Sequence, residues 1–115
     1  MPTYENIARP NEWITETDRQ FAAAIRKWVD EDVWPNRHDI DEDWQEHKII
    51  KPIMKKLMVD IGYQRGIWPE DVGGLGASSC VGFVVCCEEI ARGDSGMCTA
   101  ANCCGWPFMH ITLPW

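Results

Sequence analysis

The chain has 115 residues, with 11 Lys and Arg against 18 Asp and Glu, which gives a formal net charge of −7. This length suits one small domain, and a core of that size leaves no room for a large enclosed pocket, so a sizeable ligand would need a second wall. The acidity and the scattered basic residues argue against general binding to nucleic acid or to an anionic membrane. A hydrophobic content of 45% indicates that the chain folds.

The sequence shows no apolar run typical of a signal peptide or of a membrane span. We therefore expect a cytoplasmic protein whose six cysteines are reduced. There is no Cys-x-x-Cys, and the three histidines complete no zinc ligand set, so a structural metal site is disfavoured. The pairs Cys86–Cys87 and Cys103–Cys104 lie among small and apolar residues, which favours thiols that fill the core.

Residues 1–14 show no sustained period, and we expect them to form an extended arm before a domain that spans 15–115. Thr15 followed by Asp18 resembles a capping box, which predicts a helix start. One apolar stripe at helical spacing follows, with charged residues expected to face away from it, and Pro35 is expected to end the helix. The stripe consists of Phe21, Ile25, Trp28, Val29 and Val33, and the residues facing away are Asp18, Arg26, Asp30 and Glu31.

The acidic stretch 36–46 does not satisfy a calcium loop counted from Asp39, because Trp44 and Ile50 stand where Gly and Glu are needed. We expect a solvated connection there. Apolar residues at three- and four-residue spacing then predict a second helix over 50–61, with its lysines (Lys51, Lys55 and Lys56) turned outward. Gly62 is placed to close that helix in the left-handed conformation.

A third helix is expected to start at Ser78 or Ser79 and to end at Gly93. It is apolar on nearly every side, which predicts a central position in a bundle, with solvent contact only near Glu88, Glu89 and Arg92. A fourth helical segment, capped by Asp94 or Ser95, is expected over 97–105. No alternating strand pattern is present, so the predicted fold class is an all-α helical bundle.

The C-terminal run Ile-Thr-Leu-Pro-Trp is unusually apolar and indicates a truncated chain. Seven tryptophans are a high count for this length, and large aromatic residues often mark interfaces. We therefore expect some of them, Trp106 and Trp115 in particular, to cover other parts of a longer protein.

The run Trp-Pro-Glu-Asp-Val-Gly-Gly-Leu-Gly at 68–76 lies between two predicted helices. It lacks the order of a dinucleotide fingerprint and the Lys-Ser/Thr of a P-loop, so by itself it predicts a tight packing turn. Together with Glu-Glu-Ile-Ala-Arg-Gly-Asp-Ser-Gly at 88–96, however, it resembles the N-terminal helical domain of the acyl-CoA dehydrogenase family. The resemblance runs from about Thr15 into the small-residue segment after Gly96.

The resemblance implies a flavoprotein with a helical first domain, a β middle domain and a helical last domain, of which this chain holds only the first. It implies that FAD lies mainly between the middle and last domains, and that the last domain supplies the base. The reaction would be α,β-dehydrogenation of an acyl-CoA thioester. Implied partners are acyl-CoA, the remaining domains, an acceptor such as an electron-transfer flavoprotein, and further copies in a homo-oligomer. The chain alone is expected to be inactive.

Within the first domain, the resemblance implies a wall of the acyl-binding tunnel, with Met97, Ala101 and Asn102 as candidate lining residues. No catalytic residue is expected in this chain. Glu88 and Glu89 are adjacent on a helix and point in different directions, and Glu88 is instead placed to pair with Arg92. Two alternatives stay open: a stand-alone helical module that docks on a flavoprotein, and a piece of an acyl-CoA oxidase or flavin monooxygenase relative.

Overall fold

The computed structural model describes residues 13–66, 68–76 and 80–112, and side chains as far as residue 104. This part of the chain is helical and contains no strand, which confirms the all-α prediction. The predicted arm lies almost wholly outside the described residues, as do the start at Ser78 or Ser79 and the side chains of Trp106 and Trp115. The elements are α1 (Glu16–Trp28), η3 (Val29–Val33), η4 (Trp34–Asn36), α2 (Arg37–Glu42), α3 (Ile50–Lys55), η5 (Lys56–Asp60), α4 (Tyr63–Gly66), η6 (Glu70–Val72), α5 (Cys80–Gly93) and α6 (Ser95–Thr112).

Helix α1 begins with the predicted capping box. Asp18 N donates to Thr15 Oγ1 at 3.1 Å, and Thr15 N donates to Asp18 Oδ2 at 3.0 Å. The expectation that Asp18 faces solvent is wrong, because its carboxylate turns back to the helix start and is only 2% exposed beneath α5. Phe21 of the predicted stripe is half-buried, and the other four members lie in the core. The α-type ladder ends in the π-helical turn η3, and Pro35 lies in the 3-10 turn η4.

The connection after η4 is more ordered than the sequence predicted. Residues 37–42 form the short helix α2, and Ile40 is buried, so this part is not a wholly solvated link. Asp43 then receives backbone hydrogen bonds from residues 48, 49 and 50 at 2.6–3.0 Å. Desolvation opposes ionisation here, but these backbone donors outweigh it and hold the pKa of the Asp43 carboxyl below its usual value. The carboxylate therefore organises the start of α3.

Helix α3 and the π-helical turn η5 return beside α1 and end at Gly62, as predicted; its φ is 83°. The indole Nε1 of Trp28, buried at 1% exposure, donates to the Ile53 carbonyl at 3.1 Å. Lys51 and Lys55 are exposed, whereas Lys56 reaches back to Asp32 at 2.6 Å. This ion pair raises the pKa of the Lys56 ammonium, mainly through the hydrogen bond that Lys56 donates to Asp32.

The glycine-rich segment is a tight turn, as expected from its sequence. Gly76 N donates to the Trp68 carbonyl and Leu75 N to the Arg65 carbonyl, at 2.9 and 2.8 Å. A Cβ on Gly74 would overlap the Trp68 backbone, so only glycine fits there. Gly73 and Gly76 have positive φ. The turn folds back on α4 and positions the chain for the last two helices.

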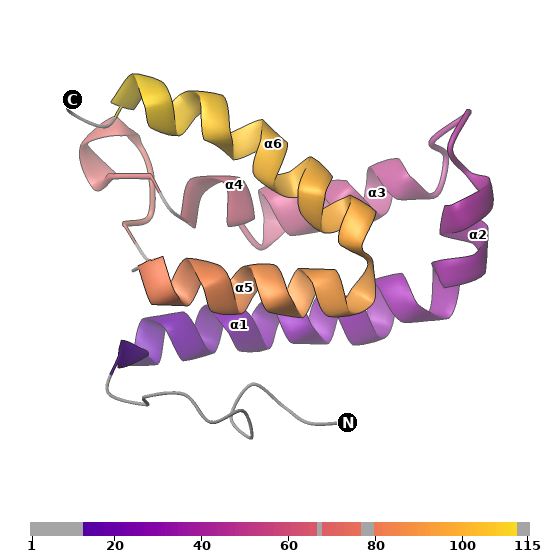
Figure 1. Cartoon of the computed structure of the whole chain (residues 1–115), viewed down its shortest axis with the longest axis horizontal. Coiled ribbons are helices and arrows are strands. Elements are labelled where there is room, and N and C mark those ends of the chain that lie inside the picture. Colours follow the sequence, from indigo (N-terminus) through magenta and orange to yellow (C-terminus); the bar gives the residue numbers. More distant parts are fainter. Residues whose placement is uncertain (1–12, 67, 77–79, 113–115) are drawn as a thin grey trace.

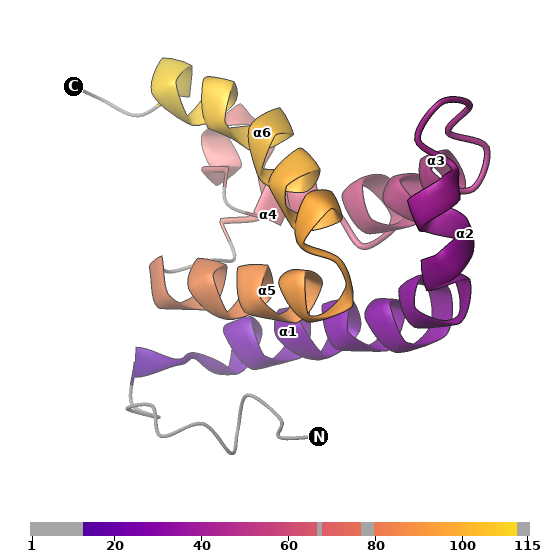
Figure 2. The same ribbon diagram turned by 45° about the vertical axis from the view of Figure 1, so that its right-hand side comes forward.

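Helices α1 and α5 run side by side in the same direction, and α6 leaves the end of α5 and crosses back (Figures 1 and 2). Two glycines allow the close approach of α5. A Cβ on Gly82 would overlap the Asp18 carboxylate, and one on Gly93 would lie 2.8 Å from Val29 Cγ1. The prediction that Glu89 and Arg92 are solvated is wrong, because both side chains turn toward this seam.

Helix α6 starts where expected, with Asp94 Oδ1 accepting from Met97 N at 2.7 Å. It does not end near residue 105 but continues through Pro107 to Thr112. A proline removes only one backbone donor, so a helix supported at its start by α5 can continue past it. The core-filling prediction holds for Cys86 but is wrong for Cys103 and Cys104, which are exposed on α6; all six cysteines are free thiols.

Candidate functional site

An open groove of about 530 Å³ lies where α2 and α3 face the first turns of α6. Its size falls in the range of small-molecule sites, and its floor is mostly apolar. The groove is not enclosed by this chain, in agreement with the limit that chain length sets on an internal pocket. The lining residues are Ile40, Asp41, Trp44, His47, Ile50, Met54, Asp94, Gly96, Met97 and Ala100.

The three sequence-predicted lining residues do not all reach the groove. Met97 lines the groove and is otherwise buried, at 4% exposure. Ala101 lies one turn further along the same face of α6, is buried in the core at 1% exposure and does not line the groove. Asn102 is turned toward α4 and α5 and takes part in a polar cluster of its own. The structure therefore brings only Met97 to the groove.

The polar cluster joins three helices at Asn102. The Tyr63 hydroxyl donates to Asn102 Oδ1 at 2.7 Å, and Asn102 Nδ2 contacts the sulfurs of Cys87 and Cys98 at 3.4 and 3.5 Å. Burial raises the pKa of the Tyr63 hydroxyl, and the hydrogen bond with Cys87 adds to the effect. Desolvation also raises the pKa of the Cys98 thiol. The tyrosine therefore stays protonated and acts as a donor that fixes α6.

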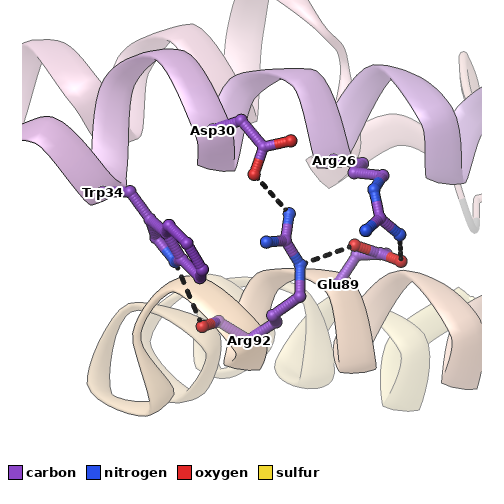
Figure 3. A network of polar contacts seen from close by, with 5 residues as sticks. All are labelled: Arg26, Asp30, Trp34, Glu89 and Arg92. Carbon is purple, nitrogen blue, oxygen red and sulfur yellow. Dashed lines mark hydrogen bonds and ion pairs between the residues drawn. The ribbon is translucent and has the colours of Figure 1, made fainter. Parts of the chain in front are cut away.

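A second polar network holds α5 against α1 (Figure 3). The Glu89 carboxylate, 4% exposed, accepts from Arg26 Nη1 and from Arg92 Nε, both at 3.1 Å. Arg92 Nη2 also reaches Asp30 at 2.8 Å, and its guanidinium lies 5.1 Å from the centre of the Trp34 ring. Every charge in the network has an opposite partner, so it is a structural seam rather than a set of groups poised for proton transfer.

Glu88 and Glu89 do not form an acid–base pair. Glu88 is exposed, whereas Glu89 is buried between two arginines. His38 is exposed beside Glu42, and His47, at a φ of 55°, touches the groove margin. Within the described ranges, no group of three or more His, Cys, Asp or Glu side chains could hold a metal ion. In the same ranges, none of the helices has the length and the hydropathy that a membrane span requires.

Sequence reasoning missed the groove and the role of Tyr63. Ile50 and Met54 carried a usable signal, since they lie four residues apart on the second predicted helix. Ile40 and Trp44 also lie four residues apart, but the acidic residues around them predict a solvated connection. Tyr63 showed no local signal, because its partner Asn102 lies 39 residues away in the sequence.

Comparison with known proteins agrees with this architecture. The family model described as "Acyl-CoA dehydrogenase, N-terminal domain" matches residues 15–112. No curated protein and no solved structure matches the chain. The match covers the helices α1 and α5, which form the seam, and the helices α2, α3 and α6, which line the groove. The chain therefore belongs to the acyl-CoA dehydrogenase family, as its N-terminal helical domain.

Proposed function

We propose that this chain is the N-terminal domain of an FAD-dependent acyl-CoA dehydrogenase and forms part of the wall against which the acyl chain lies. The observation that carries this proposal is the family match over residues 15–112. In the full-length enzyme, the reaction is the α,β-dehydrogenation of an acyl-CoA thioester. The domains outside this chain would supply the base and would pass electrons to an acceptor such as an electron-transfer flavoprotein.

The described grooves do not suit a flavin dinucleotide. The lining of the large groove holds no lysine or arginine, and the carboxylates of Asp41 and Asp94 would repel a pyrophosphate. A smaller groove of about 220 Å³ does hold Lys27 and Lys56, but Glu31 shares it and Lys56 is paired with Asp32. FAD and the phosphates of coenzyme A therefore belong to surfaces outside these two grooves.

An acyl chain places different demands on its site. It needs apolar surface and no hydrogen bonds, which the floor of the large groove offers through Met97, Met54 and Ile50. We assign Met97 to direct contact with the acyl chain. Ala101 packs in the core one turn beyond Met97, and Asn102 fixes the orientation of α6 through Tyr63.

The test is a chimera in which residues 15–112 replace the N-terminal domain of a characterised acyl-CoA dehydrogenase. We expect acceptor reduction by acyl-CoA esters, and we expect Met97→Ala to shift the preference in kcat/KM toward longer acyl chains. Met58→Ala is the matched control, because Met58 is similarly buried at 8% exposure but does not line the groove. If kcat/KM depends on acyl length in the same way for the two variants, Met97 does not contact the acyl chain.

The isolated chain provides a second test. We expect purified 115-residue protein to bind no FAD tightly and to reduce no acceptor in the presence of acyl-CoA. Tight FAD binding together with acceptor reduction would contradict the proposal that other domains supply the FAD site and the base.

A further inference from the structure

Two cysteines face each other across the hairpin formed by α5 and α6. Cys87 lies on α5 and Cys98 on α6, and both side chains are half-buried. The two sulfurs contact the same nitrogen, Asn102 Nδ2, at 3.4 and 3.5 Å. They are therefore no more than about 7 Å apart. Cys98 Sγ also donates to the carbonyl oxygen of Cys87 at 3.4 Å, which brings it against the main chain of its neighbour.

Disulfides join residues whose Cα atoms lie roughly 4.4–6.8 Å apart. The contact of the Cys98 sulfur with the Cys87 carbonyl oxygen shows that the two residues are neighbours across the hairpin. Cys86 is next in sequence but is buried at 2% exposure within the core, so it is not the favoured partner.

We propose that Cys87 and Cys98 form an oxidation-sensitive thiol pair that closes to an intramolecular disulfide with hydrogen peroxide as the oxidant. One thiolate attacks a peroxide oxygen and breaks the O–O bond, giving a sulfenic acid and one water after proton transfer. The second thiol then attacks the sulfenic sulfur and releases the second water. The two cysteines are oxidised by two electrons and the peroxide is reduced to two waters, so the step balances.

Burial raises the pKa of the Cys98 thiol, which lowers its thiolate fraction. The same disulfide results whichever of the two sulfurs attacks the peroxide oxygen first. The bond replaces the contacts of both sulfurs with Asn102 and ties α5 to α6, whereas the Tyr63–Asn102 hydrogen bond has no sulfur in it and can persist.

The experiment uses the full 115-residue chain with the exposed thiols removed by Cys80→Ser, Cys103→Ser and Cys104→Ser. The protein is treated with hydrogen peroxide, the remaining thiols are alkylated, and the chain is cut with trypsin. Cleavage after Arg92 separates Cys87 from Cys98, so a disulfide links two peptides and lowers their summed mass by two hydrogens. We expect this linked species, and we expect dithiothreitol to remove it.

Three further variants in the same background assign the bond. Cys86→Ser is the matched control and should leave the linked species intact, whereas Cys87→Ser and Cys98→Ser should each abolish it. Circular dichroism checks that every variant keeps its helix content, and Cys87→Ala and Cys98→Ala replace any serine variant that does not fold. The proposal is overturned if, in the wild-type chain, Cys87 and Cys98 are recovered unlinked after the exposed Cys103 has been oxidised. A link that depends on Cys86 would overturn it equally.

Discussion

The two sides of the bundle are built in different ways. On one side, α5 lies directly on α1, with glycines at both ends of the contact and a buried carboxylate between two arginines. On the other side, α2 and α3 stand away from α6 and leave an open groove with an exposed tryptophan at its margin. The seam buries charged groups between two helices, whereas the groove on the other side stays open to solvent.

The largest contrast is expected between two tryptophans. Trp28 is 1% exposed and bonds to Ile53, so Trp28→Ala should lower the free energy of unfolding by about 3–5 kcal/mol through lost packing and a cavity. Trp44 is 67% exposed at the groove, so Trp44→Ala should change it by less than about 0.5 kcal/mol. Urea titrations followed by circular dichroism measure both values. Equal losses would mean that the groove side is as tightly packed as the seam.

The glycines give the next contrast. Gly82→Ala forces a methyl group into the buried Asp18 carboxylate and should cost about 3 kcal/mol. Gly96 borders the groove, where the nearest atom to an added Cβ is Asp94 Oδ1 at 3.1 Å. The added methyl group must displace this capping oxygen slightly, and the helix propensity of alanine offsets that cost, so Gly96→Ala should change the free energy of unfolding by less than about 1 kcal/mol in the same urea titration. A tolerated Gly82→Ala would show that α5 does not need its close approach to α1.

Glu89 is expected to have a smaller but clear effect. Glu89→Gln removes the negative charge between Arg26 and Arg92 and should cost about 2 kcal/mol, since hydrogen bonds to charged groups are worth roughly that much. Glu31→Gln is the control, because its pairing with Lys27 is exposed and worth less than about 0.5 kcal/mol. If the two variants unfold at the same urea concentration, the seam network contributes no stability.

The smallest predicted effect concerns alkaline pH. Burial raises the pKa of the Cys86 thiol to about 12 from its ordinary value of 9.0. Between these pH values the unfolded chain has lost a proton that the folded chain retains. The contribution of Cys86 to the free energy of unfolding is therefore fully present below pH 9 and is lost as the pH rises toward 12. The slope from one such group is at most about 1.4 kcal/mol per pH unit.

Cys86→Ala should make this decline shallower, although Tyr63 and Cys98, whose pKa values are also raised, still contribute to it. The measurement is the free energy of unfolding at pH 8, 9 and 10. The slopes against pH are compared, because the substitution also lowers the free energy of unfolding at every pH. Identical slopes for the wild type and the variant would show that Cys86 is not held neutral by the fold.

The sequence alone determined the helical fold class, the capping box of α1, the closing glycine at 62 and the family, because each depends on residues within a few positions of one another or on an ordered motif. Only the tertiary structure decided that Asp18 and Glu89 are buried, that Arg26 reaches Glu89 across 63 positions, and that Met97 rather than Asn102 lines the groove. The physical reason is that helical periodicity says which residues share a face of one helix, but it does not say which helix packs against that face or how closely. Burial and the groove depend on which helices pack together and how closely. Here they depend on the close contact of α1 with α5, which lie far apart in the chain.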